Sequence, residues 1–151
     1  MCIYKEKKEK DFRMIILPSG KSKIGLIAEK NYGVTSFLSK KDSKKTGELS
    51  LWALEQCDDE IIEYSTDIKW SKSFYNCSSD SKVASVYNLI SFEFYENKYE
   101  LQLKMKDGHG YSPFEDFNGN EYRYIFNEKP SAKELGEKIM EMFEYKENYD
   151  K

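Results

Sequence analysis

The sequence contains no apolar run long enough to cross a membrane or to form the core of a signal peptide. It opens with MCIYKEKKEKDFR, which becomes charged at its fifth residue. We therefore expect a cytoplasmic protein that has no membrane partner.

Cysteines are few and irregularly placed. The three residues Cys2, Cys57 and Cys77 form an odd set without C-x-x-C spacing. Neither a disulfide framework nor a zinc site is suggested by this pattern, and a reducing compartment fits it. Cys57 and Cys77 are expected to be small hydrophobic residues of the core.

Catalytic motifs are also missing, because the chain shows no phosphate-binding loop, nucleophile signature or metal-ligand cluster. His109 is the single histidine and lies in KDGHGYS, near Asp107 and Ser112. A histidine in a mobile loop can act as a general base, so a small hydrolase using His109 is one alternative. A surface turn is favoured, since no second histidine or defined nucleophile accompanies it. We expect no enzymatic activity, no cofactor and no metal ion.

Bulky aromatic residues are plentiful. The 151 residues include 12 tyrosines, 9 phenylalanines and 2 tryptophans, although 34% of the chain is charged. This much aromatic surface suffices for the core of one folded domain, which we expect to span residues 1–151. The basic residues 1–11 and the terminal residues 146–151 are expected to fray.

One β-hairpin is indicated by alternating apolar residues in YNLISFEFYENKYELQLKMK. A two-residue turn at Glu96-Asn97 places three pairs on one face: Phe94 with Tyr99, Phe92 with Leu101, and Ile90 with Leu103. The bulky side chains expected to be buried together are Phe92, Phe94, Leu101 and Leu103.

Other segments are assigned from shorter patterns. Strands of a meander are predicted at FRMIILP, KIGLIAE and GVTSFL, with turns at Ser19-Gly20 and Asn31 to Gly33, and another strand is predicted at IIEYSTDIKW. The stretch ELSLWALEQCDDEII fits a helix or a strand, and the strand is favoured. Loops are predicted at YNCSSDSK and DGHGYSPFEDFNGN.

The C-terminal part combines a strand and a helix. EYRYIF alternates as a strand does, and Ser131 with Glu134 forms a capping box that starts a helix. The helix has one apolar stripe, made by Leu135, Ile139, Met142 and Phe143. Gly136 within it indicates a close approach to the sheet. These patterns predict a single α+β domain: a mainly antiparallel, twisted sheet with the C-terminal helix packed on one face.

This closing pattern, an aromatic strand followed by PSAKELGEKIMEMF, resembles immunity proteins of bacterial contact-dependent inhibition and related polymorphic toxin systems. The resemblance covers about a fifth of the chain. It implies a cytoplasmic protein that binds the C-terminal domain of a cognate toxin and covers its active site or substrate groove.

The charge distribution suggests the nature of that toxin. Residues 1–45 hold 12 basic and 5 acidic residues, whereas residues 46–151 hold 12 basic and 22 acidic ones. An acidic inhibitor complements a basic nuclease, which must hold phosphates. Single-stranded nucleic-acid binding is the alternative, based on the lysine-rich start and the many tyrosines. The acidic remainder opposes a polyanion, so direct binding to nucleic acid is not expected.

Two regions are predicted to form the partner-binding site. The first is an acidic segment expected to steer the partner: Asp58, Asp59, Glu60 and Glu63. The second combines acidic residues with aromatic anchors: Tyr111, Phe114, Glu115, Asp116 and Phe117. Aromatic side chains within an acidic rim are typical of protein interfaces, and Phe114 is the expected principal anchor.

Overall fold

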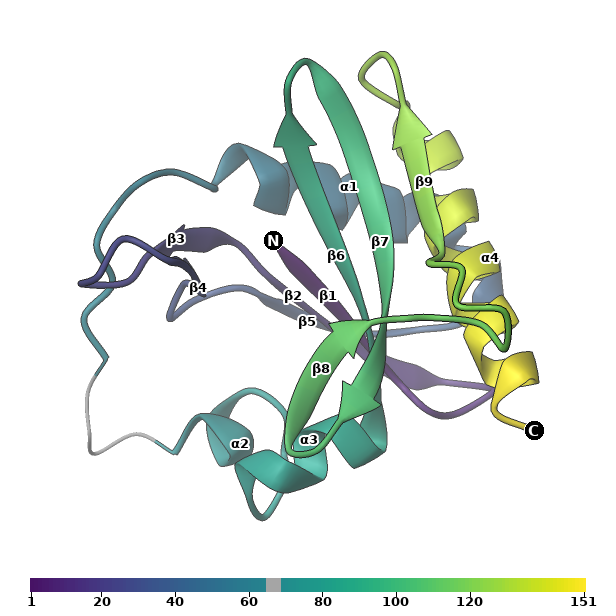
Figure 1. The fold of residues 1–151 in the computed structure, drawn as a ribbon, viewed down its shortest axis with the longest axis horizontal. Coiled ribbons are helices and arrows are strands. Elements are labelled where there is room, and N and C mark those ends of the chain that lie inside the picture. Colours follow the sequence, from purple (N-terminus) through teal and green to yellow (C-terminus); the bar gives the residue numbers. More distant parts are fainter. Residues whose placement is uncertain (65–68) are drawn as a thin grey trace.

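A seven-stranded antiparallel sheet forms the centre of the protein (Figure 1). The computed structural model describes residues 1–64 and 69–151. The strands are β1 Cys2–Glu6, β2 Phe12–Leu17, β5 Val34–Leu38, β6 Tyr87–Tyr95, β7 Lys98–Asp107, β8 Gly110–Pro113 and β9 Arg123–Phe126. Their order is β5-β2-β1-β6-β7-β8, and β9 pairs with the first half of β7. The predicted α+β fold class is confirmed.

Helices cover both faces of the sheet. They are α1 Ser43–Glu55, α2 Trp70–Ser73, α3 Asp80–Val86 and α4 Ala132–Tyr149, with a short 3-10 turn at Lys40–Asp42. Because strand side chains alternate, Ile3 of β1 points to α1 and α4, while Tyr4 points to the face covered by α3. None of these helices has the length and apolar content needed to cross a membrane, as far as the chain is described.

The β6–β7 hairpin has the predicted register. Ile90, Phe92 and Phe94 lie opposite Leu103, Leu101 and Tyr99. The turn residues Glu96 and Asn97 have φ values of 50° and 61°, as a type I′ turn requires. Only the burial of Phe94 is wrong. Its ring is 52% exposed, because the hairpin tip extends past the core and leaves this ring against Tyr99.

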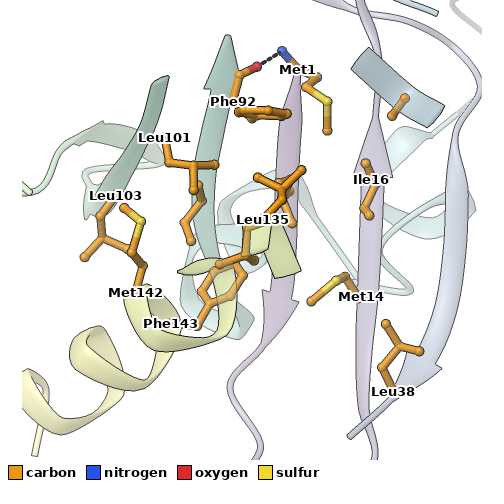
Figure 2. Packing of buried hydrophobic residues seen from close by; sticks show 14 of the residues in the cluster. Met1, Met14, Ile16, Leu38, Phe92, Leu101, Leu103, Leu135, Met142 and Phe143 are labelled. Atoms are coloured by element: carbon orange, nitrogen blue, oxygen red, sulfur yellow. Dashed lines mark hydrogen bonds between the residues drawn. The ribbon is translucent and has the colours of Figure 1, made fainter. Parts of the chain in front are cut away.

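Helix α4 begins as predicted. The Ser131 hydroxyl accepts the Glu134 N–H at 3.2 Å, and the Glu134 carboxylate accepts the Ser131 N–H at 2.9 Å. The apolar stripe of the helix is fully buried against the sheet, and Figure 2 shows Leu135, Met142 and Phe143 pointing toward strand residues such as Phe92.

Helix α1 occupies most of the segment 48–62, so the strand favoured for this segment is wrong. Its buried face consists of small residues: Thr46, Gly47, Ser50 and Ala53. Small side chains allow α1 to pack closely against α4. Gly136 of α4 was predicted to allow close approach to the sheet, and that prediction is wrong. A Cβ atom on Gly136 would lie 1.6 Å from the Ser43 carbonyl oxygen. The glycine is therefore required by contact with α1 and not with the sheet.

The remaining assignments are partly wrong. Ser19-Gly20 is not a turn but belongs to β3 Ser19–Lys21, which pairs with β4 Ile27–Glu29 in a separate ribbon. The loop predicted at residues 75–82 includes the first residues of α3, and the loop predicted at residues 107–120 contains β8. Of the strand predicted at residues 61–70, residues 65–68 lie outside the described part; Ile61 forms one bridge to Lys21, and α2 begins at residue 70.

Both chain ends take part in the fold, through β1 and α4. Strand β1 lies between β2 and β6, and the Met1 nitrogen donates a 2.9 Å hydrogen bond to the Phe92 carbonyl (Figure 2). The few apolar residues of β1 are enough to hold this strand in the sheet, because neighbouring strands cover both of its edges. At the other end, α4 continues to Tyr149, and Lys146 is buried.

Candidate partner-binding surface

The acidic segment from Asp58 to Glu63 contacts basic residues that are distant in sequence. Lys30 donates to the Asp58 carboxylate at 2.8 Å and to the Glu60 carboxylate at 3.4 Å. Asp59 and Glu63 form longer ion pairs, 3.7 Å each, with Lys21 and Lys23. The hydrogen bond from Lys30 lowers the pKa of Asp58. The β3–β4 ribbon thus neutralises much of this segment.

A cleft of about 410 Å³ lies beside this segment. Asp58 and Asp59 line it together with Phe94, Tyr95 and Tyr99 from the β6–β7 hairpin. Phe94 is 52% and Tyr95 71% exposed. This cleft was not predicted, because Phe94 was expected in the core and no local sequence pattern brings the hairpin tip next to Asp58.

Two residues of the second predicted region do not face solvent as expected. Phe114 is 1% exposed, and its ring meets Tyr149 edge-to-face at a centroid distance of 4.9 Å. The prediction that Phe114 is a partner-contacting anchor is therefore wrong, because α4 covers it. Tyr111 lies on β8, where its hydroxyl donates to the Tyr87 carbonyl at 2.9 Å and its ring packs beside Tyr4. It belongs to the opposite core.

Phe117 is the exposed aromatic residue of this region, with 92% of its surface accessible. Its ring stacks on Tyr149, with centroids 4.8 Å apart and planes 29° apart. Tyr145 lies between Tyr149 and Tyr122, at centroid distances of 6.3 and 4.9 Å. We call these four residues, Phe117, Tyr122, Tyr145 and Tyr149, the aromatic patch.

Carboxylates border the aromatic patch. Asp116 accepts the N–H groups of Asn118 and Asn120 at 2.8 and 2.9 Å, and these bonds lower its pKa. Glu115 is exposed beside it. Within the described chain, no basic side chain forms an ion pair with either Glu115 or Asp116. This distinguishes them from Asp58, whose charge is compensated.

A third carboxylate lies at the other side of the patch. Glu141 of α4 accepts a 3.3 Å hydrogen bond from the Tyr122 hydroxyl and also pairs with Lys138 at 2.7 Å. Burial and the nearby Glu141 raise the pKa of Tyr122 to about 12. Tyr122 consequently remains a neutral hydrogen-bond donor at physiological pH.

The nine predicted site residues are divided between separate surfaces. In Figure 1 the ribbon β3–β4 lies at the left, and residues 58–63 form ion pairs with it and with the adjacent Lys30, whereas the loop between β8 and β9 lies at the right beside α4. Tyr145 and Tyr149 were not predicted as site residues. Their one local signal is an i, i+4 tyrosine pair on α4, which does not reveal the loop that packs on it.

His109 lies in the turn between β7 and β8 and is exposed. The hydroxyl of nearby Ser112 donates to the Pro113 carbonyl at 3.5 Å. In the part of the chain that the structure describes, no three His, Cys, Asp or Glu side chains gather in a way that could hold a metal ion. The arrangement around the aromatic patch offers contact area, hydroxyl donors and negative charge, which are properties of a binding surface.

Comparison with known proteins shows similarity in fold. No protein-family model matches the sequence, and no curated protein matches it. A solved structure of NMB0488 from Neisseria meningitidis, a protein of unknown function, is similar with a TM-score of 0.59 and 12% identity over 92% of each chain. At this level of identity the similarity shows the fold alone.

Proposed function

We propose that this protein is an immunity protein that binds and neutralises a basic bacterial toxin domain, with the aromatic patch as its main contact surface. The observation that carries the proposal is Phe117, whose ring is 92% exposed and yet held in a stack with Tyr149. Large aromatic rings that are exposed but fixed in position are typical of the residues that dominate protein–protein affinity.

The support beneath the patch makes it suitable for tight binding. The buried ring of Phe114 meets both Tyr145 and Tyr149 nearly at right angles, at 87° and 84°. Tyrosines held in this way lose little side-chain conformational entropy when a partner binds. A smaller entropy cost therefore opposes the favourable contacts. Phe114 therefore acts through the rings above it and not by direct contact.

Charge favours a basic partner. Glu115 and Asp116 leave negative charge next to the patch, and residues 114–151 contain ten acidic against six basic residues. A nuclease domain needs a basic surface for its substrate, and an acidic inhibitor approaches such a surface faster. Inhibition by coverage needs no chemistry from the inhibitor, so we expect no enzymatic activity, and a cytoplasmic location suits this role.

Binding kinetics with a matched pair of variants tests the proposal. The expected partner is the C-terminal domain of a large secreted protein, to be sought in the reading frame immediately upstream of the one that encodes this chain. Phe117→Ala should weaken binding by about 30-fold or more, chiefly through faster dissociation, as for central aromatic contacts. Phe94→Ala is the control, because it removes another exposed phenylalanine at the cleft. It should change affinity less than about twofold.

Opposite results would be decisive. If Phe94→Ala weakens binding while Phe117→Ala does not, the partner occupies the cleft and the aromatic patch is not the contact surface. If the wild-type chain neither binds that domain nor protects cells that express it, the immunity function is rejected. Retained growth protection by Phe117→Ala with unchanged dissociation would also contradict the proposed contact.

A further inference from the structure

The sheet opens between β6 and β7. These strands pair from Tyr95 and Lys98 as far as Ile90 and Leu103. Beyond that point β6 continues along β1, with Asn88 opposite Lys5, whereas β7 turns away and pairs with β8. Figure 1 shows β7 curving away with β8 at this end of the sheet.

A cavity of about 430 Å³ lies at this opening, and four lysines line it: Lys7, Lys104, Lys106 and Lys146. Asp150 is the one carboxylate among its described lining residues, and it is paired with Lys146. This volume is within the usual range of sites for small ligands. The excess of cations is notable in a chain whose net charge is −3.

Three of these lysines donate hydrogen bonds to neutral acceptors, which for Lys104 is the side-chain oxygen of Gln102. Among the described residues, Lys7, Lys104 and Lys106 form no ion pair with a carboxylate. Lys7 donates to the Ala84 carbonyl at 3.3 Å and Lys106 to the Ser85 hydroxyl at 3.1 Å, which are neutral acceptors. Burial lowers the pKa of Lys7, and the positive charges of Lys146 and Lys106 add to this effect against the opposing charge of Asp150.

Asn88 provides an independent indication of a ligand. It is 3% exposed and lines the same cavity, and its amide nitrogen Nδ2 has no hydrogen-bond partner in the described structure. Buried amide donors are nearly always paired, because an unmade hydrogen bond to a buried polar group is costly. A donor without a partner beside several lysines suits an oxygen-rich anion.

We infer that this opening binds a small anion that carries phosphate groups. Lys7, Lys104 and Lys106 would supply the positive charge, and the Asn88 amide would donate to a phosphate oxygen. A phosphate group presents three acceptor oxygens and up to two negative charges, which matches this set of donors better than a single carboxylate does. The site shares no residue with the aromatic patch and does not depend on the proposed function.

Calorimetric titration with sodium tripolyphosphate and with inorganic phosphate tests this inference. The double substitution Lys7→Ala with Lys106→Ala removes two cations whose side chains are exposed enough to be lost without unfolding. It should weaken tripolyphosphate binding by about tenfold or more, the effect of losing charge-assisted hydrogen bonds. Lys10→Ala with Lys44→Ala is the control, since it changes the net charge equally at exposed positions outside the cavity.

The side-chain amide of Asn88 gives a second readout. Its ¹H–¹⁵N signals should shift during the titration, and Asn88→Asp, which places a carboxylate in the cavity, should abolish binding while circular dichroism stays unchanged. Equal loss of binding in both lysine double variants would overturn the inference, because it would indicate a general charge effect. So would the absence of binding at millimolar tripolyphosphate, or tighter binding of an oligothymidine that lacks a terminal phosphate.

Discussion

The two faces of the sheet bury their side chains by different means. The face under α1 and α4 is apolar and includes Ile3, Ile16 and Phe92 among its fully buried residues. The face toward α3 is rich in tyrosine, and its hydroxyl groups must find acceptors. Alternate residues of the same strands thus serve two cores, one defined by close packing and the other by satisfied hydrogen bonds.

The first face depends on the approach of two helices. A Cβ atom on Gly47 would lie 1.7 Å from the Ala132 carbonyl oxygen, and one on Gly136 would lie 1.6 Å from the Ser43 carbonyl oxygen. The helix backbones are therefore in direct contact at two positions. No side chain fits between them, so the sequence at these sites is restricted by space alone.

The second face depends on Glu29 of the β3–β4 ribbon. Its carboxylate accepts hydrogen bonds from the hydroxyl groups of Tyr4 and, at 3.2 Å, Tyr75. Tyr87 in turn donates to the Tyr75 carbonyl at 2.9 Å. Burial, followed by the charge of Glu29, raises the pKa of Tyr75, which keeps it a donor. This carboxylate also fixes the ribbon to the sheet.

Leu101→Asp should produce the largest effect, because it places a charge without a partner in the apolar face. Leu101 is completely buried, and the expected loss of about 4 kcal/mol or more is enough to unfold the domain. Ile125→Asp on β9 is the matched control, since that side chain is 44% exposed. Thermal melts followed by circular dichroism would show the difference, and similar melting temperatures for the two variants would mean that the faces are wrongly assigned.

Gly136→Ala should have the next largest effect. Alanine is the better helix former, yet its methyl group would overlap the Ser43 carbonyl, and overpacking of this kind costs about 1–3 kcal/mol. Gly110→Ala is the control, because nothing lies within 4 Å of the added atom. Urea denaturation measures both free energies of unfolding, and a more stable Gly136→Ala protein would show that α1 and α4 are not in backbone contact.

Glu29→Ala should have the smallest effect and should act on the other face. It removes the shared acceptor of Tyr4 and Tyr75, for an expected loss of about 1–2 kcal/mol. Faster amide exchange should be concentrated in β3 and β4. Glu63→Ala serves as the control, since its side chain is 82% exposed. Exchange that increases evenly over the sheet would instead mean that Glu29 does not hold the ribbon.

Local patterns in the sequence predicted those elements whose partners are close in the chain. The β6–β7 register follows from alternation around Glu96-Asn97, and the start of α4 follows from the Ser131–Glu134 box. Helix α1 was missed because its buried face consists of small residues such as Gly47 and Ala53. These small residues stabilise the fold only because α4 packs directly against them, and local hydrophobicity in the sequence does not reveal that contact.

The candidate site was predicted only in composition. An aromatic and acidic surface around residue 117 does occur, but its burial pattern is decided by contact with α4, which covers Phe114 and leaves Phe117 outside. Similarly, Asp58 meets Lys30 through the fold of the β3–β4 ribbon. Composition identifies residue types suited to an interface, whereas long-range packing decides which of them reach the solvent.

The central position of β1 has a consequence for the order in which the protein is made. Strand β1 is synthesised first, but its second neighbour, β6, begins at Tyr87, and the Met1 nitrogen bonds to Phe92. Until the ribosome has produced this later strand, the edge of β1 that β6 will cover stays open. The central sheet can therefore close only after Phe92 has been made, and until then the open edge of β1 can pair with another chain.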